Sequence, residues 1–249
     1  MPSGTRKIKL TVSYDGSCFH GFQRQGSGHR TVQSELESAL GELLGRETET
    51  FGASRTDAGV HALGQVVHFS AETGIPPERI APSLRSYLPY DLSAVGSEEA
   101  APDFHARFSA TGKLYFYIVN RSKYPMPFLR HAALHVHGEL DIGRMKEALK
   151  YFIGEHDFSA FRNLGSQPSD PVRAIDVFDL KENGPFLIFS VHGSAFLYRM
   201  VRNLVGTVIE VGRRRIEPEE ISEIIAKKDR SMAGPTLPPQ GLYLIRVDY

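Results

Sequence analysis

The sequence has few of the features that mark secreted, membrane or metal-binding proteins. It contains one cysteine, Cys18, which excludes an internal disulfide framework and a zinc site built on cysteines. Its ten histidines show no HExxH motif or paired metal-ligand spacing, so we expect no structural metal. No apolar run approaches the length of a membrane span, and residues 1–7 lack the apolar core of a signal peptide. These absences predict a cytoplasmic protein that does not act at a membrane.

The chain also has no net charge, because 29 Lys and Arg balance 29 Asp and Glu. Binding to phosphates needs local positive potential rather than a basic chain, so a nucleic-acid partner would require cations gathered by placement. With 249 residues, 41% of them hydrophobic, the chain can bury one large core or two modest ones. No short repeat or low-complexity tract appears, which excludes a solenoid.

Hydrophobic periodicity divides the first hundred residues into strands and helices. Apolar and polar residues alternate over 8–14, as in a strand with one buried face. Thr31 caps a helical pattern that Gly45 ends. The further elements expected here are a strand over 63–69, a proline-opened helix over 77–88 and an acidic connector over 90–103.

The second stretch mixes strands and helices in the same way. We expect a strand over 113–119, a helix capped by Asp141, and a hairpin at Asn183-Gly184 whose loop Pro185 lengthens beyond two residues. The remaining expected elements are helices over 196–211 and 219–228 and a last strand over 242–247. The patterns predict an α+β protein of two halves, residues 1–103 and 104–249.

The loop Ser54–His61 places an acid, Asp57, between Arg55 and Gly59. Local chemistry favours an ordinary turn, because Asp side chains bond nearby backbone N–H groups and glycine accepts positive φ. The functional alternative is that the turn holds the carboxylate of Asp57 beside a cation, where a ligand reaches it.

Arg202 and Tyr115 also admit two interpretations. Arg202 lies on a helix face otherwise apolar enough to be core; a buried arginine needs an anion, carboxylate or phosphate, whereas a snorkelling arginine reaches water. Tyr115 shares a strand face with Lys113 and Tyr117, and by itself it is typical of a half-buried core aromatic.

Several motifs occur in an order that one protein family shares over nearly the whole chain. They are Tyr14-Asp15-Gly16, Gly21–Gln25, Thr31-Val32-Gln33, Ser54–Ala62, Phe104–Ser109, Lys113–Tyr117, His156-Asp157-Phe158, Phe196-Leu197, Met200–Gly206 and Pro238–Leu244. In these motifs the chain resembles the tRNA pseudouridine synthases of the TruA type. Phe19 and Phe22 depart from the pattern, which has Tyr and Trp there, and leave the chemical motifs intact.

This resemblance implies the pseudouridine synthase fold: two α+β halves, a mostly antiparallel mixed sheet, flanking helices and an active-site cleft between the halves. The implied reaction isomerises uridine to pseudouridine at positions 38, 39 and 40 of the tRNA anticodon stem-loop, without metal or cofactor. Asp57 matches the catalytic aspartate, Arg202 its ion-pair partner, and Tyr115 the tyrosine that stacks on the base.

RNA contacts are expected from Arg55, which would help turn the uridine out of its stack, and from Arg24, Arg107 and Lys113. Arg213–Arg215 is more typical of a solvated helix end, and His61 of a packing or turn residue than of a general base. The resemblance also implies a homodimer whose clefts combine both chains, which would concentrate positive surface.

Two other classes of function stay open from the sequence. One is a non-catalytic RNA-binding module of the same fold, which would have little reason to keep Asp57, Tyr115 and Arg202 together. The other is a nucleoside hydrolase or glycosidase, which usually needs a second carboxylate near the first, and the sequence shows no such pair.

Overall fold

The computed structural model describes residues 4–26, 28–163 and 170–249, and the chain forms two compact units. The first unit contains Met1–Thr111 and Tyr243–Tyr249, and the second contains Gly112–Leu242. From the sequence we placed residues 104–111 and 243–249 in the C-terminal half, whereas their contacts group them with the first unit. Residues 1–3 of the N-terminal segment lie outside the described residues.

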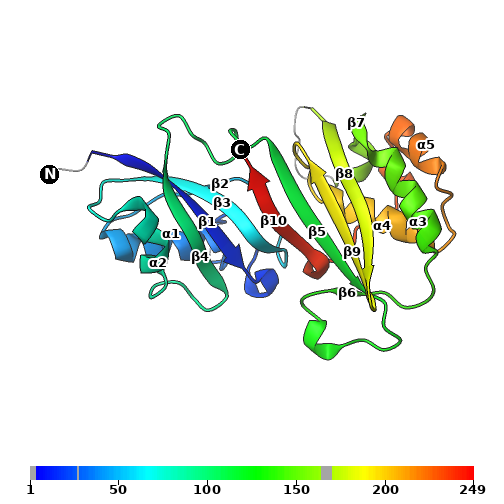
Figure 1. Cartoon of the computed structure of the whole chain (residues 1–249), viewed down its shortest axis with the longest axis horizontal. Helices are drawn as coiled ribbons and strands as arrows, with labels where there is room; N and C mark the ends of the chain where they lie inside the picture. Colours follow the sequence, from blue (N-terminus) through cyan, green and yellow to red (C-terminus); the bar gives the residue numbers. More distant parts are fainter. Residues whose placement is uncertain (1–3, 27, 164–169) are drawn as a thin grey trace. The chain divides into compact units, whose positions relative to one another are not determined.

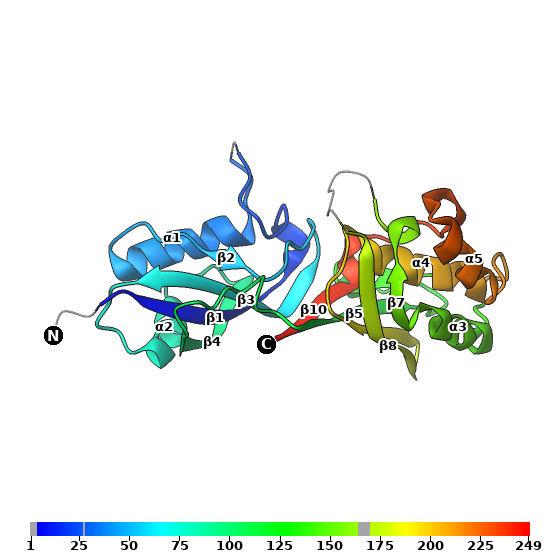
Figure 2. The ribbon, with the colours of Figure 1, turned by 90° about the horizontal axis from the view of Figure 1, so that it is seen from above.

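The first unit packs helices against an antiparallel sheet that one parallel strand extends. Its strand order is β4-β1-β3-β10, and β2 also pairs with β3. The elements are β1 (Arg6–Tyr14), α1 (Val32–Leu44), β2 (Phe51–Gly52), β3 (His61–Ala71), α2 (Pro77–Leu84), β4 (Leu92–Ala100), β10 (Leu242–Asp248) and the short helix η1 (Gly16–Cys18). Figures 1 and 2 show this unit from two directions.

The predicted strand and helix at the start of the chain are confirmed. Alternate residues of β1, from Ile8 to Tyr14, are buried, as expected for a strand with one covered face. Thr31 caps α1 through a capping box with Ser34, and Gly45 ends it at φ 70°. The apolar stripe of α1 is buried, and α1 lies along the sheet in Figure 2.

The connector predicted over 90–103 is wrong, because Leu92–Ala100 forms β4 and pairs antiparallel with β1. Hydrophobic and polar residues alternate only weakly along β4, because it is an edge strand with one neighbour. Pairing with β1 stabilises it, whereas its own residues have little preference for a strand. Helix α2 is shorter than predicted: it ends at Leu84, two residues after Pro82.

The second unit contributes four further antiparallel strands, and its helices lie against one face of them. Its strand order is β5-β9-β8-β7, and β6 pairs in parallel with β5. The elements are β5 (Gly112–Asn120), β6 (Leu134–His135), α3 (Ile142–Leu149), β7 (Gly154–Asp157), β8 (Val172–Asn183), β9 (Phe186–Gly193), α4 (Met200–Gly212) and α5 (Glu220–Lys227), with short helices η2 (Pro127–Leu129), η3 (Lys150–Phe152), η4 (Ser159–Phe161), η5 (Arg230–Met232) and η6 (Pro239–Gly241).

The β8–β9 hairpin has a two-residue connection, so the longer loop predicted from Pro185 is wrong. Asn183 pairs directly with Phe186, and Gly184 takes φ 57°. A positive φ at the first central position followed by the fixed negative φ of proline is the geometry of a type II′ turn, which suits a tight hairpin. Proline therefore fits this turn without lengthening it.

Helix α4 starts four residues later than predicted, at Met200, because Arg199 before it has left-handed backbone angles (φ 59°, ψ 13°). All thirteen of its residues are buried, which makes it the central helix of this unit. The predicted cap of α3 is confirmed: the carboxylate of Asp141 accepts from the Arg144 N–H.

In residues 4–26, 28–163 and 170–249, no helix is long and apolar enough to cross a membrane. The same described ranges contain no group of three or more His, Cys, Asp or Glu that could hold a metal ion. The mixed α+β class with a mostly antiparallel sheet, predicted from the sequence, is confirmed.

Candidate active site

The loop before β3 presents Asp57 on a tight turn. The Val60 N–H donates to the Asp57 carbonyl (3.1 Å), and Gly59, the third residue of the turn, has φ 78°. The turn that local chemistry predicts is therefore present. Asp57 is half-buried and its neighbour Arg55 is exposed, so the loop places a carboxylate and a guanidinium close together in sequence at the start of a strand.

Neighbouring segments hold this loop through the residue directly before the acid. The hydroxyls of Thr56 and Tyr14, at the end of β1, lie 2.7 Å apart in a buried contact. The Thr56 carbonyl accepts from the Phe22 N–H (3.0 Å). Earlier in the loop, the side chain of Gln65 both donates to and accepts from the backbone of Ser54. These bonds fix the backbone on the N-terminal side of Asp57.

His61 fixes the other side of the loop. It is 5% exposed, its Nδ1 accepts from the Gly16 N–H (3.1 Å), and its ring stacks on Tyr243 of β10 at a centroid distance of 4.6 Å. Nδ1 also lies 3.2 Å from a carboxylate oxygen of Asp15. These contacts agree with the packing role expected for His61.

Tyr115 lies in the second unit, on β5, where it is 8% exposed. Its ring makes an edge contact with Phe196, with centroids 5.2 Å apart at 81°. Tyr117, two residues further along β5, shares its face and is fully buried. The face of β5 that carries both tyrosines is thus its more buried face.

Arg202 of α4 lies in the same unit as Tyr115 and acts on the same strand face. Burial raises the pKa of the Tyr117 hydroxyl, and the nearby positive charge of Arg202 partly opposes that rise. The Tyr117 hydroxyl itself donates to the Pro238 carbonyl (2.7 Å). Arg202 is therefore close enough to this part of β5 to act on it electrostatically.

The side chain of Arg202 is buried, being 7% exposed, which excludes the snorkelling alternative. Its Nε donates to the Leu237 carbonyl (2.6 Å), and the Leu237 N–H donates back to the Arg202 carbonyl (3.4 Å). The burial of Arg202 meets the condition under which the sequence predicts an anionic partner for this arginine.

A buried polar network next to Arg202 holds the segment that contains Leu237. Asn203 donates to the Phe161 carbonyl (2.7 Å) and accepts from Thr236 (2.6 Å) and Arg230 (3.1 Å). Arg230 also donates to the carbonyl of Gly234 (2.9 Å). The network joins α4 to residues 230–236 and so supports the carbonyl that orients the guanidinium of Arg202.

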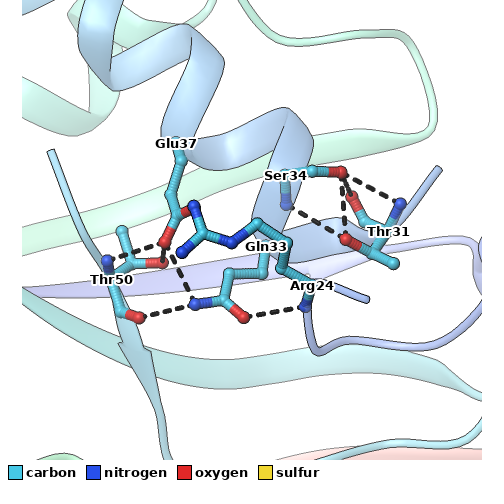
Figure 3. Close-up of polar contacts among 6 residues, drawn as sticks. All are labelled: Arg24, Thr31, Gln33, Ser34, Glu37 and Thr50. Carbon is cyan, nitrogen blue, oxygen red and sulfur yellow. Dashed lines mark hydrogen bonds and ion pairs between the residues drawn. The ribbon is translucent and has the colours of Figure 1, made fainter. Parts of the chain in front are cut away.

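The predicted RNA contacts differ in how the fold holds them. Arg24 is tied to Glu37 of α1 (2.9 Å), and Glu37 also accepts from the backbone of Thr50 and the side chain of Gln33 (Figure 3). The Arg24 side chain is still 60% exposed, which leaves part of its guanidinium at the surface. The ion pair with Glu37 fixes the direction in which the Arg24 side chain points.

The other candidates lie apart from one another along the chain. Arg107 is exposed beside Phe108, and its guanidinium lies 5.6 Å from that ring centroid. Lys113, at the start of β5, is half-buried. Arg213 and Arg215 both pair with Glu210 (2.8 Å each), which agrees with a structural helix end.

The sequence did not reveal the supporting residues of the two site segments. The Tyr14–Thr56 contact and the bond from Arg202 to Leu237 join positions far apart in the chain, so no local pattern marks them. Tyr14 lies in one of the motifs shared with the family, and Leu237 lies directly before another. Their place at these motifs was the signal in the sequence that could have pointed to them.

Each unit carries side chains whose chemistry can act on a substrate. The first unit presents a half-buried carboxylate on a braced turn, and the second presents an aromatic ring on β5 and a buried cation on α4. A carboxylate suits nucleophilic or acid–base work, and an aromatic ring suits stacking on a planar base.

Comparison with known proteins gives one consistent answer. The sequence matches the family model described as tRNA pseudouridine synthase over residues 10–109 and 148–249. It is 45% identical over 244 residues to tRNA pseudouridine synthase A of Acetivibrio thermocellus, covering 98% of this chain and 100% of that protein. Identity to the proteins of the same name from Moorella thermoacetica and Listeria monocytogenes is also 45%, over 97% and 98% of this chain and 99% of each relative. The resemblance seen in the motifs is confirmed, and the chain belongs to the tRNA pseudouridine synthase family.

Proposed function

We propose that this protein isomerises uridine to pseudouridine at positions 38, 39 and 40 of the tRNA anticodon stem-loop. The observation that carries the proposal is the braced turn that presents Asp57, which the resemblance in motifs matches to the catalytic aspartate of the family. Full-length relatives named tRNA pseudouridine synthase A support tRNA as the substrate.

The reaction breaks the N1–C1′ glycosidic bond, turns the uracil while it is held, and joins C5 to C1′. We propose Asp57 as the nucleophile. An ionised carboxylate can add to C6 of the ring, or it can trap or stabilise C1′ as the bond breaks. Either route requires an ionised carboxylate at the moment of attack.

We propose that Arg202 pairs with Asp57 in the working enzyme. A carboxylate in a base pocket loses water, which favours its neutral form, whereas a cation within about 4–6 Å favours the charged form. Arg202 is suited to this because its guanidinium is buried, and a buried charge needs a partner of the opposite sign. The bond to the Leu237 carbonyl would hold its guanidinium in place.

Tyr115 and Arg55 would handle the base. The Tyr115 ring would stack on the uracil, with its hydroxyl near the C5 proton that must leave. Arg55 is exposed and, in the part of the chain that the structure describes, forms no ion pair, so its guanidinium is available to fill the gap left by the flipped uridine or to hold a flanking phosphate. Arg24, Arg107 and Lys113 would add phosphate contacts in a cytoplasmic homodimer with shared clefts.

The decisive experiment incubates the protein with unmodified tRNA and analyses the nucleosides. Formation of pseudouridine supports the proposal, release of free uracil supports a hydrolase, and bound but unchanged tRNA supports a binding module. Asp57→Asn is the control, because asparagine keeps the size and turn preference of aspartate without its charge. Turnover of this variant should fall at least ~10³-fold while tRNA still binds. Wild-type turnover in Asp57→Asn would overturn the assignment of the nucleophile.

A further inference from the structure

We propose that residues 121–131, here named the cationic arm, bind an unpaired stretch of the tRNA through aromatic rings that stack on bases and cations that contact phosphates. The inference rests on the proposed function, because it takes tRNA as the substrate. The arm contains none of the residues to which a role was assigned above.

The cationic arm is an excursion of the chain with a fixed base. It follows β5 and returns to β6, which pairs in parallel with the end of β5, and the Val136 N–H donates to the Asn120 carbonyl (2.9 Å). His135 Nε2 lies 2.9 Å from the Ser122 carbonyl oxygen, and η2 shapes the tip. Figure 1 shows the arm as the green loop with one short helical turn beyond β6. Because its ends and tip are held, the arm loses little freedom when a ligand binds.

The cationic arm exposes two large aromatic rings. Tyr124 is 69% exposed and Phe128 is 76% exposed. Two large rings exposed within four positions of one another offer apolar surface that a partner can cover. The Lys123 ammonium lies over the Tyr124 ring, 5.4 Å from its centroid, so a ligand that contacts the ring also meets the charge. This pairing is typical of proteins that stack bases and track the phosphate backbone.

Charge indicates which partner these rings meet. The arm contains Arg121, Lys123, Arg130 and His131 and no acidic residue, although the whole chain has no net charge. Arg121 is neutralised by Glu182 (2.6 Å). Lys123 and Arg130 are exposed and have no ion pair among residues 4–26, 28–163 and 170–249. Two cations without an ion pair and two exposed rings complement a nucleic acid, which offers phosphates and planar bases. They complement a second copy of this chain, which has no net charge, less well.

The arm would act on affinity rather than on chemistry. Asn120, at its base, lies five residues beyond Tyr115 on β5, which is about 17 Å at the ordinary rise of a strand. A nucleotide on the arm is therefore not the one being isomerised. Exposed aromatic rings take up only bases that are already unstacked, so the arm selects an unpaired stretch of the tRNA.

The test uses the whole protein and two double variants of the arm. Tyr124→Ala with Phe128→Ala removes the rings, and Lys123→Ala with Arg130→Ala removes the cations. Matched controls are Tyr90→Ala, which removes a 94% exposed ring, and Arg79→Ala with Lys146→Ala, which removes two exposed cations elsewhere. For each protein we would measure the Kd for unmodified tRNA at several salt concentrations, pseudouridine formation at saturating tRNA, and the oligomeric state by sedimentation.

We expect the ring variant to bind tRNA at least about fivefold more weakly with an unchanged salt slope. The cation variant should reduce the slope of log Kd against log salt by between about one and two. Both should keep wild-type turnover at saturation, and the controls should match the wild type.

Arm variants that bind tRNA like the controls would overturn the proposal. A change of oligomeric state with unchanged tRNA affinity would overturn it too, because the arm would then be a subunit contact. The wild type separates this result from failure of the proposed function: if the wild type forms pseudouridine, unchanged arm variants refute only the arm.

Discussion

The hydroxyl of Tyr14 lies 2.7 Å from that of Thr56, the residue directly before Asp57, and both side chains are buried. We expect Tyr14→Phe to lower kcat for pseudouridine formation about three- to tenfold and to leave KM for tRNA unchanged, because the loop then holds Asp57 less precisely. Loss of the bond, with a buried hydroxyl left behind, should also cost about 1–3 kcal/mol in the free energy of unfolding by urea.

A matched control distinguishes positioning from general stability. Tyr249 also makes a hydroxyl bond in the first unit, to the Ala106 carbonyl (2.8 Å). Tyr249→Phe should lose less stability, because Tyr249 is 40% exposed, and it should keep kcat. Equal kcat losses in both variants would show that Tyr14 acts only through stability.

Arg202 gives a prediction for the dependence of activity on pH. If Arg202 pairs with Asp57 as proposed, Arg202→Ala removes the cation that favours the charged form of the attacking carboxylate, so that carboxylate is neutralised at a higher pH than in the wild type. The acidic limb of the pH–rate profile should therefore move upward by about one to three pH units. Turnover should fall far more than tRNA affinity. An acidic limb at its original pH, with normal turnover, would remove this role from Arg202.

Tyr115→Phe separates the two roles proposed for the tyrosine. Phenylalanine keeps the ring, and its contact with Phe196, but lacks the hydroxyl. If the hydroxyl moves the C5 proton, kcat should fall about 10²-fold or more while the Kd for tRNA stays within about twofold. Full activity would leave stacking as the sole function of the side chain.

Arg55→Ala tests access to a stacked base. The variant should act poorly on a uridine paired in a stem and better on the same uridine opposite a mismatch, because a mismatched base costs less to flip. Product formation from the two RNAs at equal concentration gives the ratio. A ratio equal to that of the wild type would exclude Arg55 from base flipping.

His68 gives a prediction for stability. Burial, with the charges of His105 and Lys7, lowers the pKa of His68 to about 4. Because the unfolded state then binds the proton more tightly, the stabilisation is full above about pH 6.5 and is lost as the pH falls from 6.5 toward 4. The loss should reach up to about 3 kcal/mol.

The matched variant is His68→Asn, whose amide oxygen can replace Nδ1 as the acceptor for the Ala106 N–H. Urea unfolding at pH 7, 5.5 and 4.5 should show a smaller loss of stability on acidification than in the wild type. An identical loss would mean that other groups carry the pH dependence.

Local patterns in the sequence predicted those helices and strands that form because of residues within the element itself. The alternation of β1, the Thr31 cap of α1 and the Asp141 cap of α3 depend on neighbours a few positions away. β4 was missed because pairing with β1 stabilises it, and a pattern within ten residues does not contain its partner. The start of α4 was misplaced because apolar spacing does not show the left-handed backbone at Arg199.

The candidate site shows the same division between local and distant information. The turn at Asp57 followed from residue types and spacing, whereas the sequence left open whether Arg202 is buried, and only the fold decided it. The supports of both residues did not follow from local patterns, because Leu237 and Arg202 are 35 positions apart and Tyr14 and Thr56 are 42 apart. Only the fold brings such pairs together. A resemblance to a family shows that these positions belong to shared motifs, but it does not show which residues contact each other.

The parallel strand β10 has a consequence for synthesis of the protein. Tyr243 in that strand pairs with His61 and stacks on its ring, next to the Asp57 turn, yet it is translated after all of the second unit. At about 5–20 residues per second, the ribosome reaches Tyr243 on the order of ten seconds after Thr111. During that interval His61 and Ala62 of β3 lack their partner strand, and the Asp57 turn acquires the support of Tyr243 only after the second unit has been translated.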